Sequence, residues 1–294
     1  MLAGAMKAFA GRLILRVDAI LPVLRVSCLL LGLLGLAAVY SGPVAAQELR
    51  LITSPWPPSN FLDTDGQPTG ISVATVEALK RHVGVTTPIE VLPFARGYLI
   101  AQSTPNVMLF TGGRTEERIA MGFQFIGPAV MWTHVLLARK ESPLKLPDLA
   151  SVRVQGLTVA GVRSSWQIEL IKAAGILTVE TEDHATGARM LLAGRVDLWI
   201  TSRLQASVVL TGIGQRPDAV EAKYTVRKSP SYLMISRGTD PALLARWQAA
   251  FKDLQATGFF RQTAVTWGKR LGLPLAHDPD QGFYVPLSGR DPAS

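Results

Sequence analysis

The stretch "SVRVQGLTVAGVRSSWQIELIKAAGILTVETEDHATGARMLLAGRVDLWIT", residues 151–201, decides the fold because its pattern alternates between strand and helix. The segments SVRVQGLTVAGV, LTVETE and VDLWIT are short, apolar and rich in β-branched residues, which predicts buried strands. Between them, SSWQIELIKAAG and HATGARMLLAGR have helical spacing, and Gly194 is expected to end the second helix. Alternating strands and helices are typical of an α/β fold with parallel pairing.

The same alternation precedes this stretch. LRLITS, IEVLPF and NVMLF predict strands, and ISVATVEALKRHVG and ARGYLIAQS predict helices. The proline-rich segment PWPPSNFLDTDGQPTG, residues 55–70, is expected to contain no regular structure. We therefore expect two α/β units, one from about residue 48 to 138 and one from about residue 140 to 231.

Two extended stretches, WTHVLLARKES and SYLMISRG, lie at the junctions of these units, and two helical segments follow the second stretch. A chain that crosses twice between two units predicts a first lobe from residues 47–138 and 232–294 and a second lobe from residues 139–231. Ligands of open α/β sheets bind beyond the carboxyl ends of the strands, so the two lobes are expected to share one cleft.

The first 46 residues have the pattern of a secretory signal peptide. Four basic residues precede the apolar run VSCLLLGLLGLAAVY, which is followed by Gly42-Pro43 and by the small residues of a cleavage site ending at Ala46. The alternative is an uncleaved membrane anchor, but the run is shorter than the roughly 20 residues that a spanning helix needs. We therefore expect residues 1–46 to be removed and the protein to be periplasmic.

Composition excludes several classes of function for the rest of the chain. The single cysteine, Cys28, lies in the leader, so no disulfide or thiolate metal site is expected after it. The leader holds four of the 30 basic and one of the 22 acidic residues, which leaves a formal charge of +5 without a basic block for nucleic acid. The histidines lack metal-ligand spacing, and no nucleophile elbow, zinc-protease motif or P-loop is present, so we expect neither an enzyme nor a cofactor.

The order of several motifs resembles the bacterial extracellular solute-binding proteins of family 3. Pro58, Phe61 and Asp65-Gly66 are followed by a helix, then by RTEER, SSWQ and GRVDLWI, and the resemblance covers the chain after the leader. It implies a two-lobe periplasmic-binding-protein-like fold of type II with a double-crossing hinge. It also implies that a small solute binds between the lobes.

The resemblance implies a role for Arg118, which ends the motif Thr115-Glu116-Glu117-Arg118 and would bind the carboxylate of the ligand. A guanidinium suits this role because its planar fork donates to two oxygens at once. The alternative is a surface arginine paired with a glutamate, and Arg114 is interpreted as such a solvated residue. Gly113 would let backbone N–H groups approach the same anion.

Five further ligand-binding residues are implied. Ser164 and Ser165 would begin a helix whose free N–H groups attract negative charge, although simple helix capping is the alternative. Trp56 and Phe94 lie near the aromatic wall positions of the family, and Trp56 could instead pack on its own loop. Arg96 is a further candidate contact, with an exposed arginine at a helix start as the alternative.

Two departures from the family concern the ligand's ammonium group. Receptors for α-amino acids usually bind it with acidic residues at places that correspond to Ser202 and to about Thr53, and neither is acidic here; Asp197 is interpreted as structural. A buried ammonium without a carboxylate partner is costly. We therefore expect a carboxylate-bearing solute with an aromatic or otherwise uncharged tail rather than a standard α-amino acid.

These expectations describe a monomeric periplasmic solute-binding protein that delivers its ligand to the permease of an ABC transporter. Two alternatives stay open. The same closure of two lobes could signal to a membrane receptor, or the cleft could hold an enzyme of the dehydratase type, for which the sequence offers no convincing acid and base.

Overall fold

The computed structural model describes residues 48–286. The predicted signal peptide lies outside the described residues. Within residues 48–286, none of the helices combines the length and the apolar character that crossing a bilayer requires.

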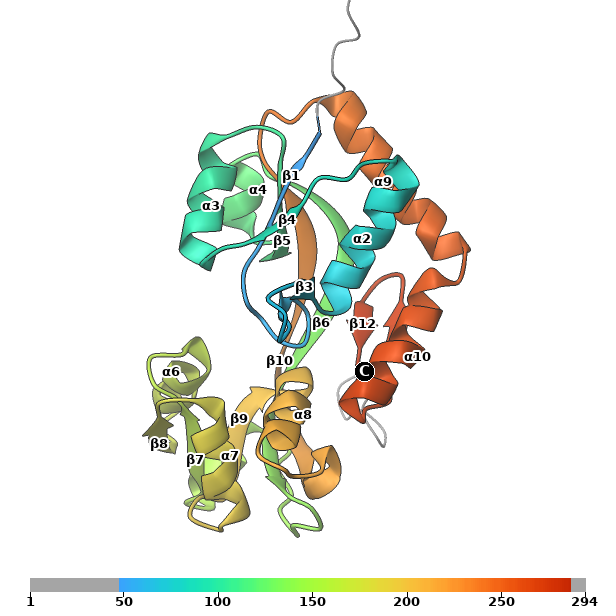
Figure 1. The fold of residues 1–294 in the computed structure, drawn as a ribbon. Helices are drawn as coiled ribbons and strands as arrows, with labels where there is room; N and C mark the ends of the chain where they lie inside the picture. Colours follow the sequence, from blue (N-terminus) through green and yellow to red (C-terminus); the bar gives the residue numbers. More distant parts are fainter. Residues whose placement is uncertain (1–47, 287–294) are drawn as a thin grey trace, which may run out of the picture. The chain divides into compact units, whose positions relative to one another are not determined.

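The first α/β unit is built around three parallel strands (Figure 1). β1 (Arg50–Thr53) lies between β4 (Ile89–Val91) and β5 (Val107–Gly113), and the helices α2 (Ile71–Val83) and α3 (Phe94–Ser103) connect these strands. α2 ends where the sequence predicts, at Gly84, whose φ of 70° is unfavourable for other residues. The predicted strands and helices of this unit are confirmed.

The second unit repeats the arrangement. β7 (Thr158–Val162) pairs in parallel with β8 (Leu177–Thr181) and with β9 (Leu198–Ser202), while α6 (Trp166–Ala173) and α7 (His184–Leu192) connect them. The apolar side chains of β9 alternate between two clusters, with Leu198 and Ile200 on one face of the sheet and Trp199 on the other. The parallel α/β pattern of residues 157–202 is therefore confirmed.

Two antiparallel strands of 16 residues each join the two units (Figure 1). β6 (Gln124–Arg139) pairs with β9, β10 (Val220–Ile235) pairs with β5, and β6 and β10 pair with each other. One sheet results, with the order β4-β1-β5-β10-β6-β9-β7-β8. The two extended stretches expected at the junctions are parts of these strands, which form the predicted double crossing.

Three expectations about local structure need correction or extension. Residues 151–154 are not a strand but belong to helix α5 (Leu149–Val154), because the carboxylate of Asp148 accepts a hydrogen bond from the Ser151 amide at 2.7 Å and caps the helix. The segment 55–70 does contain a small antiparallel pair, β2 (Phe61–Leu62) and β3 (Pro68–Thr69). The sequence pattern also missed α8 (Arg203–Gly212), which follows β9 directly.

The carboxyl-terminal helices complete the core of the first unit. α9 (Pro241–Ala256) packs against α2, and the buried Trp247 and Phe251 lie in one apolar cluster with α2. α10 (Phe259–Leu271) joins the same cluster through Phe260 and Trp267. The remaining elements are α4 (Glu116–Ala120), the short helix at Pro217–Ala219, β11 (Ala276–Asp278) and β12 (Gly282–Tyr284).

Candidate ligand-binding site

The carboxyl ends of the parallel strands bring four predicted residues to one edge of the first unit. β1 leads into the loop that carries Trp56, β4 leads into Phe94, and β5 ends at Gly113. The helix α4, which carries Arg118, begins three residues after β5. This edge is where ligands bind in open α/β sheets.

Arg118 is held in place without a carboxylate partner. Its Nη1 donates to the carbonyl oxygen of Gly113 at 2.7 Å. Its guanidinium carbon lies 5.6 Å from the ring centre of Phe94 and 5.0 Å from that of Tyr98, and these two rings are stacked at 5.7 Å. No acidic residue within residues 48–286 forms an ion pair with Arg118. The structure therefore does not contain the alternative arrangement, in which Arg118 would pair with a nearby glutamate.

Local capping explains the position of Arg118. The hydroxyl of Thr115 accepts a hydrogen bond from the Arg118 amide at 3.3 Å and starts α4. Arg114 lies outside this helix, is exposed, and has its guanidinium carbon 6.0 Å from the ring centre of Phe125. The two arginines therefore occupy different surroundings, although only three residues separate them.

Trp56 is half exposed, with 51% of its surface accessible, and its ring centre lies 5.8 Å from that of Trp132 in a T-shaped arrangement at 90°. It therefore packs on β6 rather than on its own loop alone.

The loop that carries Trp56 is fixed by the buried residue Asn60, whose backbone carbonyl accepts a hydrogen bond from the Trp56 amide at 2.6 Å. The side-chain oxygen of Asn60 accepts from the Thr111 hydroxyl at 3.1 Å. Sequence reasoning did not select Asn60 and Thr111, because only the fold brings them together.

Arg96 is an exposed residue between Phe94 and Tyr98 in α3. It lies in the first turn of this helix, and its charge contributes to lowering the pKa of Glu90, for which the main cause is the hydrogen bond from Arg50. The structure thus matches the alternative interpretation, an exposed arginine at the start of a helix, and ligand contact by Arg96 remains a prediction.

The start of α6 presents the predicted residues of the second unit. Ser165 is the N-cap, and its hydroxyl accepts from the Ile168 amide at 3.3 Å. Ser164 precedes it with a φ of 57°. The predicted capping of α6 is therefore confirmed for Ser165, and ligand contact by the two serines stays a prediction. Trp166 is 40% exposed and is not a core residue.

The side chains around Trp166 come from the two joining strands. Its ring lies 4.8 Å from that of His134 at 83°, and the guanidinium carbon of Arg227 lies 5.2 Å from its centre. His134 is buried, and its Nδ1 lies 3.4 Å from the side-chain nitrogen of Gln167. Burial, with smaller contributions from Arg227 and His184, lowers the pKa of His134 to about 4. His134 is therefore neutral at pH 7.

The two places where an ammonium partner would be expected hold neutral, buried residues. The Ser202 hydroxyl accepts from the Gln205 amide at 3.1 Å and caps α8. The Thr53 hydroxyl donates to the carbonyl oxygen of Phe110. Asp197 accepts two hydrogen bonds from Thr158, each at 2.8 Å, so its structural interpretation is confirmed.

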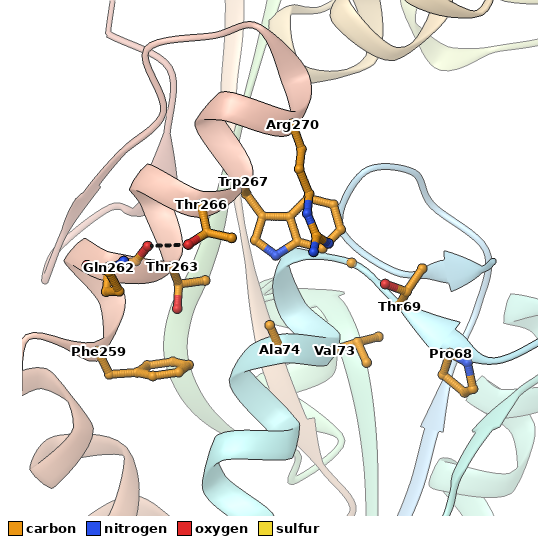
Figure 2. A pocket seen from close by; sticks show the side chains of 11 residues that line it. Pro68, Thr69, Val73, Ala74, Phe259, Gln262, Thr263, Thr266, Trp267 and Arg270 are labelled. Atoms are coloured by element: carbon orange, nitrogen blue, oxygen red, sulfur yellow. Dashed lines mark hydrogen bonds between the residues drawn. The ribbon is translucent and has the colours of Figure 1, made fainter.

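Other features of the described residues lie apart from this site. No group of three or more acidic, histidine or cysteine side chains within residues 48–286 could hold a metal ion. The side chains labelled in Figure 2 line a hollow between α10 and the start of α2. Its volume is about 340 Å³, and the guanidinium carbon of Arg270 lies 5.0 Å from a ring centre of Trp267. None of the predicted site residues lines it.

Solved structures share the fold at low sequence identity. An ancestral cationic amino acid solute-binding protein has a TM-score of 0.61 and 21% identity, covering 75% of this chain and 95% of that one. The unliganded, open L-cystine solute receptor of Neisseria gonorrhoeae has 0.60 and 20%, with coverage of 77% and 93%. A histidine kinase sensor domain with similarity to periplasmic binding proteins has 0.56 and 21%, with coverage of 75% and 96%.

No curated protein matches this sequence. The likeness to solved structures shows the two-lobe fold of type II periplasmic binding proteins. The family model of the bacterial extracellular solute-binding proteins, family 3, matches residues 49–270, which is more than half of the chain. The chain therefore belongs to family 3 of the bacterial extracellular solute-binding proteins.

Proposed function

We propose that this protein is a periplasmic receptor that captures a small carboxylate-bearing solute between its two lobes and delivers it to an ABC-type permease. The observation that carries the proposal is the arrangement of Arg118. One of its nitrogens is held by the Gly113 carbonyl and its face lies on two aromatic rings, yet no protein carboxylate in the described part of the chain neutralises it. A guanidinium offers five donors, so most remain for a ligand carboxylate.

The double crossing supports capture by closure. β6 and β10 are the strands that run from one unit to the other, so a change in their backbone angles can move one lobe against the other. A solute that contacts Arg118 in the first lobe and the start of α6 in the second stabilises the closed state, because only that state makes both sets of contacts.

Sensing is the second candidate, supported by the likeness to the sensor domain of a histidine kinase. It uses the same binding step and differs only in the membrane partner. The two candidates are distinguished by the protein that crosslinks to the closed, liganded form.

The proposal is tested by thermal-shift screening of the chain from residue 47 against amino acids, monocarboxylic acids, dicarboxylic acids and keto acids, followed by titration calorimetry of every hit. We expect stabilisation by at least one carboxylate and loss of this stabilisation when the carboxylate is replaced by its amide. Hits that keep their affinity as amides would contradict the proposal.

A further inference from the structure

Tyr98 links two other aromatic rings in the first lobe. Its ring centre lies 5.7 Å from that of Phe94 and 5.9 Å from that of Phe123, and the ring planes differ by 11° and 20°. Phe123 is buried in an apolar cluster with side chains of β1, β5 and β10, and Tyr98 is partly buried against the same cluster. The stack therefore connects the exposed ring of Phe94, through Tyr98, to the core of the lobe.

The hydroxyl of Tyr98 reaches the helix that carries Arg118. It donates to Sδ of Met121, the residue that ends α4, at 3.5 Å. The amide of Phe123 donates to the backbone carbonyl oxygen of Arg118 at 3.1 Å. These contacts join α3 to the end of α4, so the Tyr98 ring and the backbone of Arg118 keep their relative positions.

Two kinds of contact act on the Arg118 guanidinium, and they fix different features of it. The hydrogen bond from Nη1 to the Gly113 carbonyl oxygen, at 2.7 Å, fixes the position of one nitrogen. The rings of Tyr98 and Phe94, with centres 5.0 Å and 5.6 Å from the guanidinium carbon, restrict rotation of the guanidinium plane. A carboxylate accepts two parallel hydrogen bonds from a guanidinium only near that plane, so the rings set the direction from which a carboxylate binds.

We propose that Tyr98 is a positioning residue of the ligand-binding site, whose ring holds the plane of the Arg118 guanidinium for the carboxylate of the ligand. This inference rests on the proposed function, in which Arg118 binds that carboxylate. Phe94 is exposed and is itself a predicted ligand contact, so its loss would combine two effects. Tyr98 is less exposed and its ring is the nearer one to the guanidinium carbon, and it acts through Arg118.

Titration calorimetry of the chain from residue 47 tests this role with acetate, benzoate, succinate and pyruvate, each beside its amide. The acid that the wild-type chain binds most tightly is then titrated into Tyr98→Leu and Tyr98→Phe. We expect Tyr98→Leu to bind it about fivefold or more weakly, because the guanidinium loses the nearer ring. Tyr98→Phe should bind almost like the wild-type chain, because the ring remains and only the weak bond to Met121 is lost. Wild-type affinity in a folded Tyr98→Leu would overturn the inference.

A double-mutant cycle separates positioning from a general loss of structure. Tyr98→Leu should have little further effect on binding of the same acid when Arg118→Ala is already present, because its ring acts only through the guanidinium. An equal loss in both backgrounds would overturn the inference. Should Tyr98→Leu fail to fold, as judged by circular dichroism, Tyr98→Met takes its place, since it keeps more side-chain volume without a ring.

Phe125→Leu is the matched control. Phe125 is also partly buried against the same apolar cluster, and the guanidinium carbon of Arg114 lies 6.0 Å from its ring centre. This variant removes an aromatic ring below the arginine that is not part of the site, so it should be less stable in urea and keep wild-type affinity for the acid. A loss of affinity as large as that of Tyr98→Leu would assign the effect to the core and overturn the inference.

Two failures can be told apart. If the wild-type chain prefers one of the acids to its amide and Arg118→Ala weakens that binding while Tyr98→Leu does not, the positioning role is wrong and the proposed function stands. If the wild-type chain binds none of the acids, or binds each amide equally well, both the function and this inference are wrong.

Discussion

Arg118 donates through Nη1 to the carbonyl oxygen of Gly113 at 2.7 Å, so the last residue of β5 fixes the direction of the guanidinium. The rings of Phe94 and Tyr98 hold its face. An arginine pre-organised in this way loses little conformational freedom when it binds a carboxylate. Phe94, which is predicted to line the cleft with its ring, therefore contacts Arg118, the residue predicted to bind the carboxylate.

We expect the aromatic wall at Trp56 to matter for binding more than for folding. Trp56→Ala removes a half-exposed ring that contacts Trp132 edge to face, so the free energy of unfolding should fall by only about 1 kcal/mol. The affinity for an identified ligand should fall severalfold, and Trp56→Phe should restore most of it. Calorimetry and denaturant unfolding of both variants check this. An alanine variant that binds like the wild-type protein would show that Trp56 does not contact the ligand.

Ser165 combines a structural role with a predicted binding role, and Asp148 provides a matched comparison. Both residues cap helices of the second unit, α6 and α5, and loss of either cap should lower the free energy of unfolding by about 1 kcal/mol. Only Ser165→Ala should also weaken ligand binding, because Asp148 lies before β7 and not after its carboxyl end. Equal affinities of the two alanine variants would assign Ser165 to capping alone.

The buried His134 predicts a pH dependence of stability. Its pKa is about 4 in the folded protein and 6.5 in the unfolded chain, so between these values the unfolded chain binds more protons. Stability should therefore be complete above about pH 6.5 and should fall as the pH is lowered towards 4, by about 2–3 kcal/mol for this residue.

His134→Gln should remove part of this dependence in urea unfolding measured from pH 4 to pH 7. A second part belongs to His277, because burial lowers its pKa to about 4 as well. An unchanged slope in His134→Gln would contradict the neutral, buried state of this histidine.

Local sequence patterns predicted most of the fold because each element carried its own signal. Gly84 stops α2 through a backbone conformation that glycine tolerates, and β9 reads as a short apolar run. The segment SVRV, residues 151–154, was wrongly predicted to be a strand, because the helix cap formed by the Ser151 amide and the Asp148 carboxylate outweighs the alternating pattern of its side chains. α8 was missed because its cap, Ser202, is also the last residue of a strand.

The site was less predictable than the fold. The motif around Arg118 is local, so its position after β5 could be predicted. The hydrogen bond between Thr111 and Asn60 joins residues 51 positions apart in the sequence. Strand register alone places His134 of β6 opposite Ser202 of β9 and opposite Arg227 of β10. The register of β10 against β6 shifts at three places, so counting residues along the two strands does not predict which residues lie opposite each other.

The central claim is that Arg118 binds the carboxylate of the ligand and Arg114 does not. Titration calorimetry with an identified ligand tests it most directly in Arg118→Ala, Arg118→Lys and Arg114→Ala. Arg118→Ala should weaken binding by about tenfold or more with nearly unchanged unfolding, since a charge-assisted bond contributes about 1.5–3 kcal/mol. Arg118→Lys should restore part of the affinity, and Arg114→Ala should change it little. Wild-type affinity in Arg118→Ala, or a larger loss in Arg114→Ala, would contradict the account.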